Sequence, residues 1–269
     1  MHRIAVLSPS RFSLYTICVA ELLRRQHVHI EAIYVRRLAS GRRVFSELRR
    51  DGSRLLTKLW KKLVLRDRAY TARDYETIVS FMQREKIAFR RVDAFQVEHG
   101  IPVVYCDDLN DEVVVDGLRK AMPEMVVFTG GGLLRREVLS NAGAGVLNCH
   151  MGVLPAYRGM DVVEWPILEG RFDEIGMTAH FMDDGVDTGD ILRVTKMEIR
   201  PGETIGQLRE RFEPVMCREI VRACTEFLGG VLLRHPQRGE REKQYFVMCP
   251  RLIRLASRRL DQFHQTGKN

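Results

Sequence analysis

Apolar runs with almost no polar alternation recur along the chain, and helical segments separate them. Residues 3–8 (RIAVLS) and 29–35 (HIEAIYV) are short β-rich runs, joined by a segment whose apolar side chains repeat at helical spacing. Residues 101–106, 124–132 and 144–150 continue the series, and such runs are typical of strands buried on both faces of a parallel sheet. The pattern predicts an α/β fold with an open, mostly parallel, Rossmann-like sheet and helices on both faces. Ligands of such sheets bind beyond the carboxyl ends of the strands.

The length of 269 residues suffices for one substantial α/β domain with an appendage. We predict a main domain over residues 1–205 and a short C-terminal extension, helical with a basic tail, over residues 206–269. A strong helix opens this extension, because Thr204 is a suitable N-cap and the apolar side chains repeat at helical spacing up to Gly229.

The net charge of +8 is concentrated in two segments. Residues 36–91 carry 17 Lys and Arg against 6 Asp and Glu, and residues 232–269 carry 9 against 3. Within the first segment a Leu/Trp stripe at helical spacing predicts a helical basic insert, about residues 38–91. Its charge is either a solvated helix face or a contact surface for an anionic partner.

The amino-acid composition limits the class of protein to which this chain can belong. The hydrophobic fraction of 45% and the charged fraction of 29% are those of an ordinary globular protein, and no apolar run approaches the roughly 20 residues that span a bilayer. Six cysteines are scattered without CxxC pairs, which predicts neither a zinc site nor a disulfide scaffold. We therefore expect a cytoplasmic protein with no metal and no membrane partner.

Two polar side chains stand at the end of one predicted strand. Asn148 and His150 are two residues apart, so both point to the same side of the strand. Gly152 and Pro155 indicate a turn just beyond, which would expose the pair at the carboxyl edge of the sheet. Cys149 between them points to the opposite face, and we predict a buried core thiol there, not a nucleophile.

A second group of polar side chains lies in an acidic loop. Asp183, Asp184, Asp187 and Asp190 crowd a glycine-containing segment whose spacing does not match a calcium loop. A carboxylate held near His150 would fix the imidazole and favour its protonated form. An Asn–His–Asp trio without a Ser or Cys nucleophile indicates group transfer through a tetrahedral intermediate, with the amide and the imidazolium stabilising the oxyanion.

At these residues the sequence resembles the folate-dependent formyltransferase family. Residues 148–159 (NCHMGVLPAYRG) are similar to the family pattern Asn-x-His-Pro-Ser-Leu-Leu-Pro…(Tyr/Phe)-Arg-Gly. Residues 176–192 (GMTAHFMDDGVDTGDIL) are similar to its Gly-x-Thr-x-His…Asp-x-Gly-x-Asp-Thr-Gly segment. The resemblance covers residues 1–205 and is closest in character to the nucleotide-sugar N-formyltransferases.

The resemblance implies a role for each matched residue. Asn148, His150 and Asp187 would be catalytic, N10-formyltetrahydrofolate would donate the formyl group, and a primary amine would attack the formyl carbon directly. His180 would have a supporting role. The folate pocket would be formed by Phe128, Gly130, Leu133, Leu134, Asp183, Asp184 and Val186. Leu133 and Leu134 have an alternative role, in packing the helix that follows them.

Departures from the family pattern bear on the acceptor. Residues 8–16 lack the Gly-x-Gly-Ser loop of glycinamide ribonucleotide transformylase, and the chain ends before the β-barrel that the tRNA enzyme carries. A small-molecule amine, foremost a nucleotide-linked amino sugar, is therefore the expected acceptor, with Arg11, Arg158 and Trp165 as substrate-binding residues. Arg158 would bind phosphate or anchor a loop.

The function, the oligomeric state and the effect of one departure from the family pattern stay open at this point. A methionyl-tRNA formyltransferase-like enzyme that uses the basic insert to bind nucleic acid is one alternative, and a non-catalytic folate- or nucleic-acid-binding relative is another. The sequence does not fix the oligomeric state, so a homo-oligomer also stays open. Met151 and Gly152 replace the usual Pro-Ser and remove a hydroxyl near the transferred group.

Overall fold

The computed structural model describes residues 2–37, 76–130, 132–237 and 243–266. The first and larger part of the predicted basic insert, residues 38–75, lies outside these described residues. The remainder of the insert contains helix α4 (Ile78–Arg84), in agreement with the helical spacing found there.

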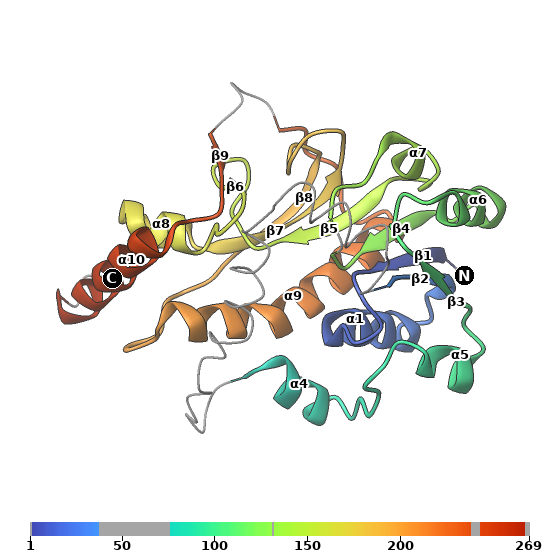
Figure 1. Cartoon of the computed structure of the whole chain (residues 1–269), viewed down its shortest axis with the longest axis horizontal. Coiled ribbons are helices and arrows are strands. Elements are labelled where there is room, and N and C mark those ends of the chain that lie inside the picture. Colours follow the sequence, from blue (N-terminus) through green and yellow to red (C-terminus); the bar gives the residue numbers. More distant parts are fainter. Residues whose placement is uncertain (1, 38–75, 131, 238–242, 267–269) are drawn as a thin grey trace.

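A seven-stranded sheet in the order β3-β2-β1-β4-β5-β7-β8 forms the centre of the described structure (Figure 1). The parallel strands are β1 (Arg3–Ser8), β2 (His29–Arg36), β3 (Val103–Cys106), β4 (Met125–Phe128) and β5 (Val146–His150). Beyond β5 the sheet continues with β7 (Gly176–Met182), which is antiparallel to β5, and β8 (Ile191–Lys196), which is antiparallel to β7. The predicted open and mostly parallel sheet is confirmed.

Helices cover both faces of the sheet, as predicted. Packed on one face are α1 (Leu14–Arg25), α4, α5 (Ala94–His99) and α9 (Ile205–Leu228). The other face carries α6 (Glu112–Ala121) and α7 (Arg136–Leu139). The connection from β1 leads to the first face and the connection from β4 to the second, so the chain reverses its direction of winding between these neighbouring strands. The carboxyl edge at such a reversal is where open α/β sheets bind ligands.

Strand β5 alternates its side chains between the two faces. Leu147 and Cys149 are buried among the residues of α1 and α9, while Val146 is buried in the core beneath α6 and α7. Because strand side chains alternate with period two, Asn148 and His150 point to the side of Val146. The predicted common orientation of Asn148 and His150 is thereby confirmed.

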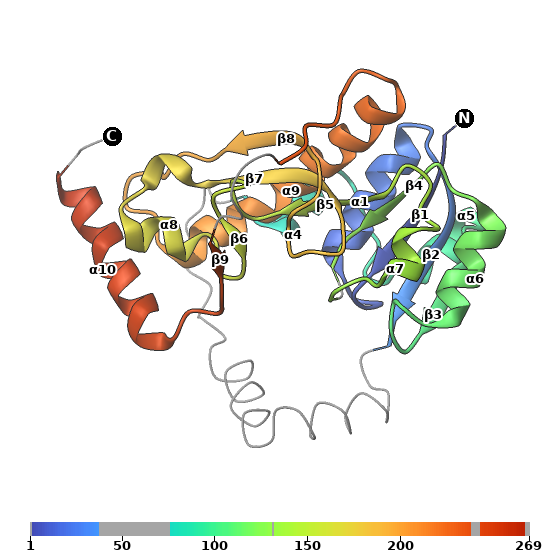
Figure 2. The same cartoon turned by 90° about the horizontal axis from the view of Figure 1, so that it is seen from above.

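After α9 the chain contributes one strand to a second, two-stranded sheet. Strand β9 (Gln244–Tyr245) pairs in parallel with β6 (Arg158–Gly159), outside the main sheet. Helix α10 (Pro250–Thr266) then lies beside α8 (Glu164–Glu169), and both views place this pair at the end of the molecule away from α6 (Figure 2). The short 3-10 helix η1 (Phe172–Glu174) leads from α8 into β7. None of the described helices is long and apolar enough to cross a membrane.

Helix α9 begins and ends where the sequence predicts. Thr204 Oγ1 accepts a hydrogen bond from the Gln207 amide at 3.3 Å, and Gln207 Oε1 accepts one from the Thr204 amide at 2.9 Å. This reciprocal capping box satisfies two backbone donors at the N-terminus of the helix. At the other end Gly229 is the C-cap.

Replacing the cap residue tests how much this box stabilises the fold. We expect Thr204→Ala to lower the free energy of unfolding by about 1 kcal/mol, because one helix donor loses its acceptor. Thr204→Ser keeps the hydroxyl and should retain the wild-type value. Urea denaturation of the three proteins measures the difference, and equal stability of the Ala and Ser variants would contradict the assignment of the cap.

Candidate active site

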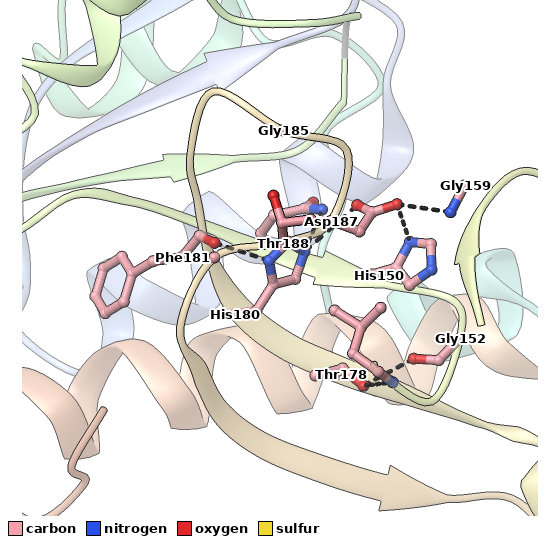
Figure 3. Close-up of polar contacts among 12 residues, drawn as sticks. His150, Gly152, Gly159, Thr178, His180, Phe181, Gly185, Asp187 and Thr188 are labelled. Atoms are coloured by element: carbon pink, nitrogen blue, oxygen red, sulfur yellow. Dashed lines mark hydrogen bonds and ion pairs between the residues drawn. The ribbon is translucent and has the colours of Figure 1, made fainter. Parts of the chain in front are cut away.

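The fold brings the three predicted catalytic side chains together at the carboxyl end of β5. Asn148 and His150 project from β5. Asp187 comes from the loop between β7 and β8 and faces His150 (Figure 3). His150 Nδ1 lies 3.5 Å from Asp187 Oδ2, and the neighbouring His180 Nε2 lies 3.6 Å from Asp187 Oδ1. The Asp187 carboxylate therefore stands between two imidazoles whose ring planes are perpendicular, with centroids 6.2 Å apart.

His150 has an acceptor at each ring nitrogen. Its Nε2 lies 2.9 Å from the Tyr157 carbonyl oxygen, and its Nδ1 faces the Asp187 carboxylate. A carbonyl oxygen only accepts hydrogen bonds, so His150 Nε2 donates to Tyr157, while Nδ1 faces the carboxylate at a distance longer than an ordinary hydrogen bond. The ring is buried, which fixes its orientation between these two partners.

His180 has the opposite hydrogen-bond pattern. Its Nδ1 donates to the Phe181 carbonyl oxygen at 2.8 Å, so its Nε2 is left to accept from the Asn148 amide at 3.2 Å. Burial lowers the pKa of His180 to about 4, although Asp187 opposes this shift, and the ring is only 1% exposed. A neutral His180 thus orients the Asn148 amide nitrogen and leaves its second hydrogen available to a ligand.

The Asp187 carboxylate is oriented by backbone contacts. The Gly159 amide donates to its Oδ2 at 2.9 Å. Asp187 itself has a left-handed backbone, with φ of 54°, which aspartate tolerates better than most residues. The Gln237 side-chain amide donates to the carbonyl oxygens of Asp187 and Gly189, at 3.1 Å and 2.7 Å, and so holds this bend.

The other aspartates of the loop have different surroundings. Asp183 Oδ1 accepts from the Gly185 amide at 3.0 Å and from the Thr188 hydroxyl at 2.6 Å, which ties the loop into a compact turn. Asp184 is exposed and Val186 is half-buried. Over the described residues no group of three His, Cys, Asp or Glu side chains is arranged to hold a metal ion.

The turn after β5 is fixed by a buried threonine. Thr178 Oγ1 donates to the Gly152 carbonyl oxygen at 2.7 Å and accepts from the Leu154 amide at 3.0 Å. A Cβ atom on Gly152 would lie 2.6 Å from the Tyr157 carbonyl oxygen and 2.7 Å from His150 Nε2. Glycine at this position, in place of the family's serine, leaves room for the hydrogen bond between those two atoms.

Cys149 is a core residue, as predicted. Its thiol is buried on the face of β5 that packs against α9. Burial raises its pKa far above the ordinary value of a thiol, so the nucleophilic thiolate is not formed near neutral pH.

The residues predicted for the folate pocket lie at the end of β4 and on two loops at the carboxyl edge of the sheet. Phe128 and Leu134 are buried in the core beneath α6 and α7. Leu134 therefore has the packing role that the sequence analysis gave as its alternative to folate binding. Leu133 is 71% exposed, and Gly130 has a positive φ of 112° in the loop that follows β4. A folate-binding role for this loop and for residues 183–186 remains a prediction.

The residues predicted for substrate binding already have protein contacts. The Arg11 guanidinium pairs with Asp93 at 2.9 Å. Arg158 is buried in β6, a position that favours loop anchoring over the binding of phosphate. The Trp165 indole N–H donates to the Phe246 carbonyl oxygen at 3.0 Å.

Sequence reasoning missed three groups that orient the site. Two are backbone atoms, the Tyr157 carbonyl and the Gly159 amide, which any residue type supplies and no motif letter encodes. The third is Gln237, which lies 50 residues along the chain from Asp187. The left-handed backbone that Gln237 supports is decided by tertiary packing, so the local sequence gave no signal for it.

Comparison with known proteins places the chain in a family. A family model described as formyl transferase matches residues 74–224. The chain belongs to the formyl transferase family. Over 149 residues it is 32% identical to the methionyl-tRNA formyltransferase of Lachnospira eligens, which covers 55% of this chain and 47% of that protein. The chain spans about half the length of the curated relatives it matches.

Solved structures share the formyltransferase fold over most of this chain. A sugar N-formyltransferase from a Shewanella species superposes with a TM-score of 0.57 at 12% identity and covers 96% of this chain and 87% of that one. An N-formyltransferase from Helicobacter canadensis, in complex with folinic acid and dTDP-3-aminofucose, has a TM-score of 0.55 at 12% identity, with 91% and 71% covered. At such identity the likeness shows the fold alone.

The buried neutral histidine predicts a pH dependence of stability. The pKa of about 4 in the folded state lies below the ordinary 6.5, so between these values the unfolded chain binds more protons. The free energy of unfolding therefore falls as the pH falls through this window, by up to about 1.4 kcal/mol per pH unit for one group.

His180→Gln removes this contribution, since glutamine does not titrate. Urea denaturation of both proteins from pH 4 to 8 measures it as a difference curve. We expect the variant to gain stability relative to wild type as the pH falls from 6.5 towards 4, and the difference to stay constant between pH 7 and 8. A flat difference throughout would contradict the neutral assignment of His180.

Proposed function

We propose that this protein transfers a formyl group from N10-formyltetrahydrofolate to a primary amine carried on a nucleotide-linked sugar. The observation that carries the proposal is the convergence of Asn148, His150 and Asp187 at the carboxyl end of β5. Amide and imidazolium donors beside a carboxylate suit a reaction in which negative charge develops on a carbonyl oxygen.

The donor would bind between the two loops that flank β5. The loop after β4 offers backbone groups around Gly130 and Gly132, each with φ of 112°, and the exposed side chain of Leu133. Residues 183–186 offer the second wall. Support for a folate donor comes from the Helicobacter canadensis enzyme of the same fold, whose structure holds folinic acid.

The chemistry needs one bond to form, one to break and one proton to move. The amine nitrogen attacks the formyl carbon, and the bond between that carbon and N10 of the folate then breaks. The second amide hydrogen of Asn148 and the Nε2–H of His150 would stabilise the oxyanion, with the formyl oxygen competing with the Tyr157 carbonyl for the latter. The proton lost by the amine would reach N10 through His150 and Asp187.

Support for a sugar acceptor comes from the neighbours in fold. The Shewanella enzyme is a sugar N-formyltransferase, and the Helicobacter canadensis structure holds dTDP-3-aminofucose. A nucleotide-linked acceptor carries phosphates, and Arg11 and Arg37 lie at the same edge of the sheet as His150, following β1 and β2. Arg11 is paired with Asp93 and Arg37 with Asp107, so a bound phosphate would have to compete with these two carboxylates.

A second candidate acceptor is methionyl-tRNA. The observation in its favour is that the matched curated relatives are methionyl-tRNA formyltransferases. The 17 basic residues against 6 acidic ones in segment 36–91 are the kind of charge that binds a nucleic-acid backbone.

Substitution of the central histidine tests the proposed mechanism. We expect His150→Ala to lower kcat by roughly 10²- to 10⁴-fold, because both a proton carrier and an oxyanion donor are lost. Release of tetrahydrofolate with a panel of nucleotide-linked amino sugars measures the rate. Binding of folinic acid by calorimetry should stay near the wild-type affinity, since His150 is assigned to the reacting groups and not to the pterin pocket.

Cys149→Ala is the matched control on the same strand. It removes a neighbouring side chain that faces the opposite core, so kcat should stay within about threefold of wild type. Wild-type turnover by the His150→Ala variant would refute the mechanism, and absence of turnover with every amine by the wild-type protein would refute the proposed function.

The salt dependence of tRNA binding distinguishes the two candidate acceptors. For the amino-sugar acceptor we expect negligible binding of bulk tRNA at physiological ionic strength. For the RNA acceptor, the logarithm of the association constant should fall steeply with the logarithm of the salt concentration, with a slope of about 0.7 to 0.9 for each phosphate contacted. Filter binding between about 50 and 300 mM salt, roughly a sixfold range in salt concentration, measures the slope. Submicromolar affinity with a steep slope would transfer the assignment to tRNA.

A further inference from the structure

Two backbone groups of one short segment orient the acid–base pair of the site. His150 Nε2 donates to the Tyr157 carbonyl oxygen at 2.9 Å. The Gly159 amide donates to Asp187 Oδ2 at 2.9 Å (Figure 3). His150 and Asp187 are themselves 3.5 Å apart, which is longer than an ordinary hydrogen bond. Their relative placement therefore depends on residues 157–159.

Those residues are held from outside the main sheet. Gly159 is paired with Tyr245 of β9, and the Met160 amide donates to the Tyr245 carbonyl oxygen at 3.0 Å. The rings of Tyr157 and Tyr245 are stacked, with centroids 5.3 Å apart and planes inclined by 24°. Both phenol hydroxyls donate to Glu169, at 3.0 Å from Tyr157 and 2.9 Å from Tyr245.

The approach of β9 to this segment requires glycine. Gly159 has φ of 103°, a conformation that side chains rarely adopt. A Cβ atom there would lie 2.1 Å from the Tyr245 carbonyl oxygen. The closeness of the two backbones leaves little freedom for the Gly159 amide that faces Asp187.

The chain after Tyr245 anchors β9 in turn. The Phe246 carbonyl oxygen accepts from the Trp165 indole at 3.0 Å, and the Met248 amide donates to Asp161 Oδ2 at 2.8 Å. Helix α10 then packs on α8, where Leu260 is buried, and on η1, where Phe263 stacks on Phe172 with centroids 4.1 Å apart. These contacts make residues 244–266 one continuous band against the 157–172 region.

We propose that residues 244–266, the C-terminal strap, position His150 and Asp187 for reaction, with Tyr245 as the positioning residue. The strap acts through the Tyr157 carbonyl and the Gly159 amide, which it holds by strand pairing and by the stacked tyrosines. The expected effect of the strap on the rate rests on the formyl transfer proposed above. Its expected effect on the order of residues 157–159 in the substrate-free protein does not.

The strap's central contact is separate from the cores that stabilise the sheet. Tyr157, Val162 and Tyr245 form a hydrophobic cluster of their own, apart from the clusters on the two faces of the sheet. A pair of strands as short as β6 and β9 is marginal without side-chain support. Removing the Tyr245 ring should therefore release residues 157–159 and leave the main fold intact.

Tyr245→Ala against Tyr245→Phe tests the effect on catalysis. The Ala variant loses the stack, and we expect kcat to fall about tenfold or more while KM for the amine and for the formyl donor stays within about twofold, as expected when only the reacting groups are misplaced. The Phe variant keeps the stack and should restore kcat to within about threefold of wild type. Unchanged kcat in the Ala variant, or a parallel loss of folinic acid binding in it, would overturn the proposal.

Amide exchange tests the same inference without any turnover. In the substrate-free protein we expect the Gly159 and Met160 amides to exchange at least about tenfold faster in Tyr245→Ala than in Tyr245→Phe, while the amides of Val126 and Leu147 keep their protection. Unchanged exchange at Gly159 would overturn the strap. If the wild-type protein formylates no amine, the proposed function fails, and this measurement still decides whether the strap holds the site.

Discussion

The antiparallel register between β5 and β7 is the constraint on which the site depends. It places Asn148 opposite His180 and His150 opposite Thr178. The first pairing lets a neutral imidazole orient the amide, and the second brings the threonine hydroxyl to the turn that follows His150. A slip of one residue would turn the side chains of either strand to the other face. The buried apolar residues that alternate with these polar ones, Leu147 and Cys149 among them, prevent that slip.

The two histidines beside Asp187 show how surroundings separate the roles of identical side chains. His180 meets a carbonyl at one nitrogen and an amide donor at the other, which the neutral ring satisfies. His150 meets acceptors at both nitrogens. One carboxylate therefore lies between two imidazoles whose hydrogen-bond partners are of opposite kinds.

Much of the fold and the convergence of the three polar side chains could be predicted from the sequence. The apolar runs, the helical spacing of α1 and the cap at Thr204 are local signals that the packed structure does not override. The two-residue spacing of Asn148 and His150 fixed their common face in the same way. Leu133 and Leu134 show the limit of such signals, because one is exposed and the other buried, and only the loop that follows β4 decides which.

What the sequence could not predict is the part of the site made of backbone. The Tyr157 carbonyl and the Gly159 amide are oriented by a strand that arrives from residues 244–245, and pairing over such a separation leaves no local pattern. In the sequence, this use of backbone groups is reflected in two glycines, Gly152 and Gly159. Gly152 gives His150 access to the carbonyl, and Gly159 lets β9 approach, so each marks a place where a backbone group takes a role that side chains usually have. The side chains that directly follow these two strands, Met160 and Phe246, are more than half exposed, so they can change without moving the two backbone groups.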